Sequence, residues 1–238
     1  MEKEREEQVI SLCQKLIQQK SYSGEESGVV GVLSENMKQM GFDEVTVDKY
    51  GNIIGCIKGN RPGKKVLFDG HIDTVPVTEE AEWLYPPFAA EIHDGKIYGR
   101  GTSDMKGAVA AMTCAASNYA KDTGKDFAGE IYVAGVVHEE CFEGVAAREI
   151  SKNVRPDYVV IGEASQLNLK IGQRGRAEIV IETFGKPCHS ANPEKGINAV
   201  YKMAKVIGAI RTLVPTHHPV LGDGILELTD IKSAPYPG

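Results

Sequence analysis

The sequence predicts an α/β protein with a mostly parallel sheet and flanking helices, followed by the first half of a smaller α+β domain. Buried-strand patterns such as EIYVAGVV (130–137) and YVVIG (158–162) alternate with amphipathic helical patterns. Such alternation is typical of an α/β layered domain with a largely parallel sheet. The pattern then changes near residue 170: AEIVIETFG (177–185) alternates strictly, which favours a half-exposed antiparallel strand and a second domain.

The individual elements follow from hydrophobic periodicity and from turn residues. Helices are predicted at 4–20, 25–40 (ending at Gly41), 104–119, 144–152 and 197–213. Strands are predicted at 44–48, 52–58, 65–69, 130–137, 158–162, 177–185 and 224–232. EIHDGKIYG (91–99) predicts a compact hairpin, because Asp94-Gly95 is a favoured two-residue turn.

Composition excludes several functional classes. The chain has 238 residues, is 42% hydrophobic and carries a net charge of -6, with its basic residues scattered, unlike a nucleic-acid-binding surface. No apolar run approaches the roughly 18 residues that a membrane span needs. The five cysteines lie far apart, which indicates reduced thiols and a cytoplasmic location. We therefore expect neither nucleic acid nor membrane as a partner.

Ionisable residues recur where predicted buried strands end and where one helix starts. They are His71 and Asp73 after 65–69, Asp104 at the start of 104–119, Glu139 and Glu140 after 130–137, and Glu163 after 158–162. The carboxyl ends of parallel strands converge on one crevice, so these groups are expected to meet in space. One histidine with several carboxylates suits Zn²⁺, Mn²⁺ or Co²⁺. The pattern predicts a metal site that compensates the buried charge.

Each of these residues also has a simpler explanation. Asp104 alone is a favourable residue at a helix N-terminus. The acidic pair after 130–137 is compatible with a solvated strand end, and Glu163 with an arginine partner. His138 and Cys141 are neighbours in sequence, but nothing beyond proximity supports a site there. The metal site is favoured because four such groups recur at equivalent positions, whereas GxSxG, HExxH, Walker and GxGxxG motifs are absent.

Four segments together resemble the M20 family of zinc-dependent amidohydrolases and peptidases. They are GHIDTVPV (70–77), YGRGTSDMKGAVAAM (98–112), VVHEECFEGVAA (136–147) and VVIGEAS (159–165). The resemblance runs over essentially the whole chain in the family's order. That family includes acetylornithine deacetylase and succinyl-diaminopimelate desuccinylase. The HEE and GEAS variants are most similar to its selenium-metabolism-linked hydrolase branch.

The resemblance implies a role for each residue and a cofactor of two divalent ions, Zn²⁺ with Co²⁺ or Mn²⁺ as alternatives. The metal ligands would be His71, Asp104 (bridging both ions, with a cis peptide to Met105), Glu140 and Glu163. The catalytic residues would be Asp73, which orients His71, and Glu139, the general base. Residues 1–172 would form the metal-binding catalytic domain.

The resemblance also implies a second domain over 173–238, the start of a lid that mediates homodimerisation. His189 matches the lid histidine that binds substrate, often in the partner subunit. Family members are longer, finish the lid, return to the sheet and supply a last histidine ligand. His217 and His218 do not fit that ligand. The chain is therefore expected to be the N-terminal part of a longer protein, with an incomplete catalytic domain.

The function implied is hydrolysis of an amide bond in an N-acyl amino acid or small peptide by a metal-activated water. The alternative is a metal-binding, non-catalytic interaction protein or an inactive fragment of the same fold. Glu139 speaks against that alternative, because a pure binder needs no base, whereas the incomplete lid speaks for it. A plain structural α/β domain would leave the clustered acids unexplained.

Overall fold

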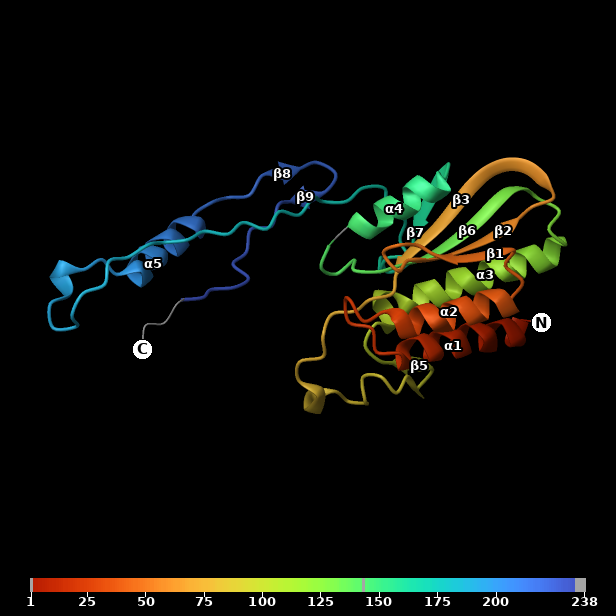
Figure 1. Cartoon of the computed structure of the whole chain (residues 1–238), viewed down its shortest axis with the longest axis horizontal. Helices are drawn as coiled ribbons and strands as arrows, with labels where there is room; N and C mark the ends of the chain where they lie inside the picture. Colours follow the sequence, from red (N-terminus) through yellow and green to blue (C-terminus); the bar gives the residue numbers. More distant parts are fainter. Residues whose placement is uncertain (1, 143, 234–238) are drawn as a thin grey trace. The chain divides into compact units, whose positions relative to one another are not determined.

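The computed structural model describes residues 2–142 and 144–233, in two compact units. The first unit comprises residues 1–167 and the second residues 168–238, and each is described by itself (Figure 1). The division lies close to the change in sequence pattern near residue 170. Among the described residues, no helix is long and apolar enough to cross a membrane.

A five-stranded sheet forms the centre of the first unit, in the order β1-β2-β6-β3-β7. The strands are β1 (Glu44–Val47), β2 (Ile53–Lys58), β3 (Arg61–His71), β6 (Ala128–Val136) and β7 (Tyr158–Ile161). β3 is parallel to both β6 and β7, whereas β2 is antiparallel to β1 and to β6. Four of the five strands therefore run in one direction, which confirms the mostly parallel sheet.

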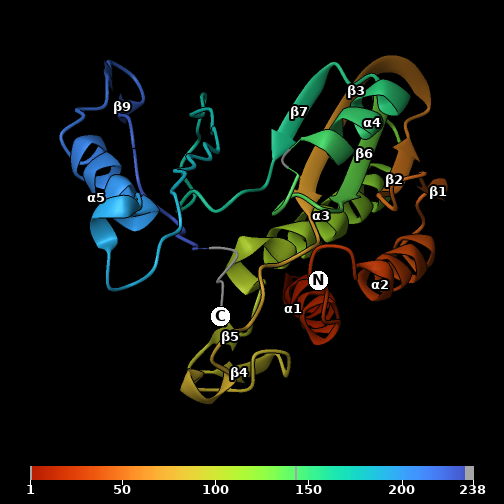
Figure 2. The same ribbon diagram turned by 60° about the vertical axis from the view of Figure 1, so that its left-hand side comes forward.

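Helices cover the two faces of this sheet unequally. α1 (Glu2–Gln18), α2 (Ser27–Gln39) and α3 (Gly107–Thr123) lie on one face, and α4 (Val145–Val154) lies on the other (Figures 1 and 2). β3 lies close to α3 and to the segment before it: a Cβ atom on Gly70 of β3 would lie 2.6 Å from the Met105 methyl carbon and 2.8 Å from Val109 of α3. A larger residue at position 70 would force these side chains to shift.

The core forms because the helices bury apolar residues at helical spacing. On α1 these are Leu12, Cys13, Leu16 and Ile17, and on α2 they include Val29, Leu33 and Met37. The spacing of three or four residues places each set on a single helix face. α2 ends as expected before Gly41, whose φ of 88° is a left-handed conformation that glycine tolerates.

Strand direction and register bring the predicted site residues to one edge of the sheet. His71, the last residue of β3, is paired with Val136, the last residue of β6. Asp69 of β3 is paired with Ile161, the last residue of β7. The three strands are parallel and end at nearly the same level. The segments that follow them, including Glu139, Glu140 and Glu163, therefore start at one edge.

Two elements, α3 and β3, begin at other residues than the sequence predicts. α3 begins at Gly107 rather than at Asp104, because Asp104 and Met105 have non-helical dihedral angles within the π-helical segment Thr102–Lys106. β3 begins at Arg61, and its register with β6 is irregular before Lys65. The peptide bond between Asp104 and Met105 is cis, which confirms that expectation.

The structure confirms the hairpin that the sequence predicts between β3 and α3. β4 (Glu91–His93) and β5 (Lys96–Tyr98) pair antiparallel, and a short 3-10 helix (Glu80–Glu82) precedes them. Asp94 and Gly95 both have positive φ, 49° and 72°. Two successive residues with positive φ are what a type I′ turn requires.

The second unit corrects two predicted strands. It contains a 3-10 helix (Pro193–Lys195), α5 (Ala199–Ile210), β8 (His217–His218) and β9 (Gly222–Asp223). The segments 177–185 and 224–232, predicted as strands, have no strand structure. Alternation makes a segment suitable for a sheet, but a strand also needs a partner for its backbone groups. Within the described residues, no pairing involves either segment.

Because the core is closely packed, shortening a buried side chain of α2 should lower the stability of the protein strongly. Leu33 is fully buried, so Leu33→Ala should lower the free energy of unfolding by about 2–5 kcal/mol, from lost apolar burial and the cavity left behind. Urea unfolding followed by circular dichroism measures this change. Leu84→Ala is the matched control, because Leu84 is 76% exposed and should change stability by less than about 0.5 kcal/mol.

Candidate metal centre and active site

His71 is the buried centre of the site. It is 3% exposed, and both of its ring nitrogens face oxygen atoms. Nδ1 lies 2.9 Å from the backbone oxygen of Asp73, and Nε2 lies 2.8 Å from Oδ1 of Asp104. Burial by itself lowers the pKa of His71, but the hydrogen bonds to Asp73 and Asp104 and the charge of Glu163 raise it to about 10. These acceptors therefore favour the protonated form of the ring.

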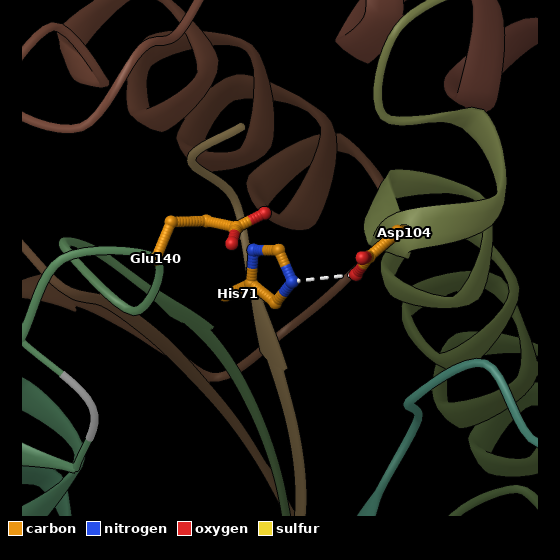
Figure 3. A group of neighbouring side chains, drawn as sticks. All are labelled: His71, Asp104 and Glu140. Atoms are coloured by element: carbon orange, nitrogen blue, oxygen red, sulfur yellow. Dashed lines mark hydrogen bonds and ion pairs between the residues drawn. The ribbon is translucent and has the colours of Figure 1, made fainter. Parts of the chain in front are cut away.

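The carboxylates of the predicted ligand set gather around His71. One ligand atom from each of His71, Asp104 and Glu140 lies within 4.8 Å of the other two (Figure 3). Oε1 of Glu163 lies 3.6 Å from Nε2 of His71. β3, the segment before α3, the turn after β6 and the segment after β7 each contribute one residue. Groups far apart in sequence thus meet at the edge of the sheet.

Negative charge is in excess at this site. Burial raises the pKa of Glu139, Glu140 and Glu163; His71 lowers each, and neighbouring carboxylates raise each further. Carboxylates with raised pKa values are stabilised by a nearby cation. One imidazole nitrogen and several carboxylate oxygens form a donor set that suits a divalent ion such as Zn²⁺. The residues present therefore fit the metal centre that the sequence predicts.

Asp73 links His71 to the turn after β6. Its side chain is 0% exposed and accepts hydrogen bonds from the Ser23 hydroxyl at 2.6 Å and from the Glu139 and Glu140 amides, each at 3.1 Å. Burial by itself raises the pKa of Asp73, but these donors, together with His71, lower it below the usual range. The closest contact with the His71 ring is made by the backbone oxygen, while Oδ1 lies 3.5 Å from Nδ1.

The turn after β6 is held by three buried side chains, of which the sequence singled out Asp73 but not Asn52 or Glu26. Four consecutive amides donate to buried acceptors: Val137 to Asn52 and His138 to Glu26, both at 3.0 Å, and Glu139 and Glu140 to Asp73. Ser23 lies in the polar turn SYSGEE, Glu26 near the start of the predicted helix 25–40, and Asn52 at the start of the predicted strand 52–58. No signal in the sequence distinguishes such buried acceptors from solvated turn residues.

Lys106 is a further buried group next to the site. It is fully buried, and its Nζ donates to the backbone oxygens of Leu16 and Gln19, at 3.0 Å and 2.8 Å. Burial lowers the pKa of Lys106 to about 8, although the charge of Asp73 opposes this change. The side chain joins the segment that carries Asp104 to the C-terminal end of α1.

His138, His189 and His217 each have contacts with other residues than those of the cluster. His189 lies in the second unit, is exposed, and accepts a hydrogen bond from the Ala191 amide. His217, also in the second unit, pairs with Asp223 at 2.7 Å. The His138 ring faces Glu26 at 3.7 Å, while the Cys141 sulfur contacts the His138 backbone oxygen rather than the ring.

The raised pKa of His71 predicts that metal binding releases a proton. A metal ligand must be deprotonated, so an ion that binds His71 at pH 7 displaces about one proton. The apparent affinity for Zn²⁺ should therefore rise by about tenfold per pH unit between about pH 6 and pH 8. Calorimetric titration in buffers of different ionisation enthalpy measures the proton count. An affinity independent of pH over this range would contradict the arrangement.

Comparison with known proteins gives relatives along most of the chain. Residues 67–223 match the family described as peptidase family M20/M25/M40. YgeY of Escherichia coli is 37% identical over 215 residues, which cover 89% of this chain and 53% of YgeY. A protein named succinyl-diaminopimelate desuccinylase 2, from Ruegeria sp., is 32% identical and covers 79% of this chain and 50% of its own length. The chain thus spans about half the length of the curated relatives it matches.

Solved structures confirm the α/β fold. An M20 family metallo-carboxypeptidase from Sulfolobus solfataricus has a TM-score of 0.65 at 21% identity, covering 85% of this chain and 49% of that one. A di-peptidase from Saccharomyces cerevisiae has a TM-score of 0.62 at 21% identity, covering 96% of this chain and 55% of that one. At these identities the likeness shows the fold alone. The family match over residues 67–223 goes further: this chain belongs to peptidase family M20/M25/M40.

Proposed function

We propose that this protein is a metal-dependent hydrolase that cleaves an amide bond of an N-acyl amino acid or a small peptide. The observation that carries the proposal is the placement of ligand atoms of His71, Asp104 and Glu140 within 4.8 Å of one another, next to Glu139. Membership of a peptidase family and relatives named succinyl-diaminopimelate desuccinylase support the reaction class.

The cofactor proposed is a pair of divalent ions, with Zn²⁺ first and Co²⁺ or Mn²⁺ as alternatives. His71, Asp104, Glu140 and Glu163 are the residues that would hold them. The charge of Asp104 contributes to the raised pKa values of Glu140 and Glu163, so these carboxylates repel one another. This repulsion supports the binding of more than one cation at the site. When bound, such ions polarise a carbonyl group and lower the pKa of a bound water.

The chain's own residues are proposed to supply the proton transfers and the orientation. Glu139 is half-buried, and burial raises its pKa, as suits a general base working near neutral pH. Its carboxylate would take a proton from the attacking water and deliver it to the leaving amine. Asp73 would hold both His71 and the Glu139 backbone in place. His189 would bind the substrate and stabilise negative charge on its carbonyl oxygen.

Metal analysis coupled to a substrate screen tests this proposal directly. The purified protein would be assayed for zinc, cobalt and manganese and incubated with N-acetyl and N-succinyl amino acids and with dipeptides. Release of free amine that stops with a chelator and returns with added metal would support the proposal. A protein that binds metal tightly but cleaves none of these compounds would instead favour a metal-binding interaction protein.

The roles of the adjacent acids predict two different mutant behaviours. Glu139→Gln keeps shape and hydrogen bonding but cannot accept a proton. It should therefore bind metal normally and lose kcat by about 10²–10⁴-fold, the usual size of a general-base contribution. KM should change little, because only an interaction of the transition state is lost. Metal content and turnover are measured on the same preparation.

Glu140→Gln is the matched control for this experiment. The same substitution is made at the next residue. Because Glu140 is proposed to bind metal, Glu140→Gln should lose bound metal and turnover together. A Glu139→Gln protein that turns over near the wild-type rate would contradict the assignment. So would a Glu139→Gln protein that loses metal while Glu140→Gln retains it.

The location and the domain roles are also proposals. We propose residues 1–172 as the catalytic domain and 173–238 as the start of a lid that mediates homodimerisation. Exposed apolar side chains in the second unit support association, among them Ile179, Val180, Phe184 and Val214. The five cysteines are all free, which supports a reducing, cytoplasmic location.

Dimerisation predicts a measurable mass in solution. The protein should sediment as a dimer at tens of micromolar, because burying the apolar side chains of the second unit between two copies removes them from water. Analytical ultracentrifugation over a concentration series measures this equilibrium. A single monomeric species throughout the series would count against the lid as a dimerisation domain.

A further inference from the structure

We propose that Glu26 is a positioning residue that holds the turn His138–Glu140, and through this turn sets the orientation of Glu139 and Glu140. Its effect on turnover rests on the function proposed above, whereas its effect on the turn stands on the geometry alone. Glu26 is distant in sequence from every residue of the metal cluster, and it immediately precedes α2.

The contacts of Glu26 join two backbone segments. The side chain is 5% exposed, and a single oxygen, Oε1, accepts the amide hydrogens of Gly24 and His138, each at 3.0 Å. The same oxygen lies 3.7 Å from Nδ1 of the His138 ring. A buried carboxylate is stable only when donors surround it. The backbone of the turn after β6 supplies one of these donors.

The turn needs this support because of its own conformation. His138 has a φ of 57°, in the left-handed region that is unfavourable for residues other than glycine. β6 has ended at Val136, so the amides that follow have no neighbouring strand to bond. Asn52 accepts from the amide before His138, and Asp73 from the two amides after it. Without Glu26, the backbone amide of His138, which lies between these residues, would lose its hydrogen-bond acceptor.

The segment that carries Glu26 is itself fixed beside the metal ligands. The Ser21 hydroxyl donates to the Ile72 backbone oxygen at 2.7 Å, and the Thr74 amide donates to the Ser21 backbone oxygen at 2.9 Å. Ser23 donates to the Asp73 carboxylate. The segment 21–26 therefore binds the chain after β3 through its serines and the chain after β6 through Glu26. One segment therefore connects the ends of β3 and β6.

Three substitutions test the inference. Glu26→Ala removes the acceptor, and Glu26→Leu removes it while keeping the side chain's bulk. Glu26→Gln keeps an oxygen that can accept the same amides. Glu25→Ala is the matched control, because Glu25 is the neighbouring, exposed glutamate. Amide hydrogen exchange by NMR reports on residues 138–140 and does not depend on activity.

The expected result is local. In Glu26→Ala and Glu26→Leu, the amides of His138, Glu139 and Glu140 should exchange at least about tenfold faster, while amides within α3 keep their protection. kcat should fall by about 10–100-fold, with KM changed by less than about threefold, because a positioned base acts in the transition state. Glu26→Gln should restore most of both properties, and Glu25→Ala should match the wild type.

Three outcomes would overturn the inference. The first is unchanged exchange at residues 138–140 in both Glu26→Ala and Glu26→Leu. The second is global unfolding of both variants, which would make Glu26 a general stability element. The third is a Glu26→Gln variant as impaired as Glu26→Leu. By contrast, a wild-type protein without hydrolytic activity would count against the proposed function only, and hydrogen exchange would then decide the role of Glu26.

Discussion

The buried carboxylate of Asp73 is the interaction on which the site depends. A carboxylate with no exposed surface is costly to bury unless its oxygens are well supplied with donors. The donors come from Ser23 in the segment before α2 and from the Glu139 and Glu140 amides after β6. The backbone oxygen of Asp73 itself binds His71. One residue thus ties the ends of two parallel strands to an N-terminal turn.

The charge distribution explains why these strand ends would require a cation. His71 contributes buried nitrogen atoms to the cluster, and three glutamates around it have raised pKa values. The raised pKa of His71 means that a proton on its ring would compensate part of that negative charge. A divalent ion would replace that proton and compensate more of the charge. The carboxylates that repel one another, those of Asp104, Glu140 and Glu163, are the groups expected to bind the ion.

The two units show why the same type of pattern succeeded in one place and failed in another. In the first unit, each predicted strand finds a neighbour. β7 pairs with β3 as expected, but its residues are exposed and not buried as the sequence predicts. In the second unit, segments 177–185 and 224–232 alternate as clearly but remain without strand pairing. Local pattern states only which conformation a segment can adopt. A strand forms when other backbone satisfies its hydrogen-bonding groups.

The sequence alone determined the α/β class, most elements of the first unit and the identity of the ionisable residues that follow its strands. It did so because hydrophobic periodicity and strand direction are local properties, and parallel strands place their ends together. Only the tertiary structure decided which polar residues at the ends of these elements are buried: Glu26 and Asn52 accept the amides of His138 and Val137, a role that their positions at the start of a predicted helix and a predicted strand do not indicate. Burial of a polar group depends on what packs over it. That is a property of the whole fold, because the covering segments come from distant parts of the chain.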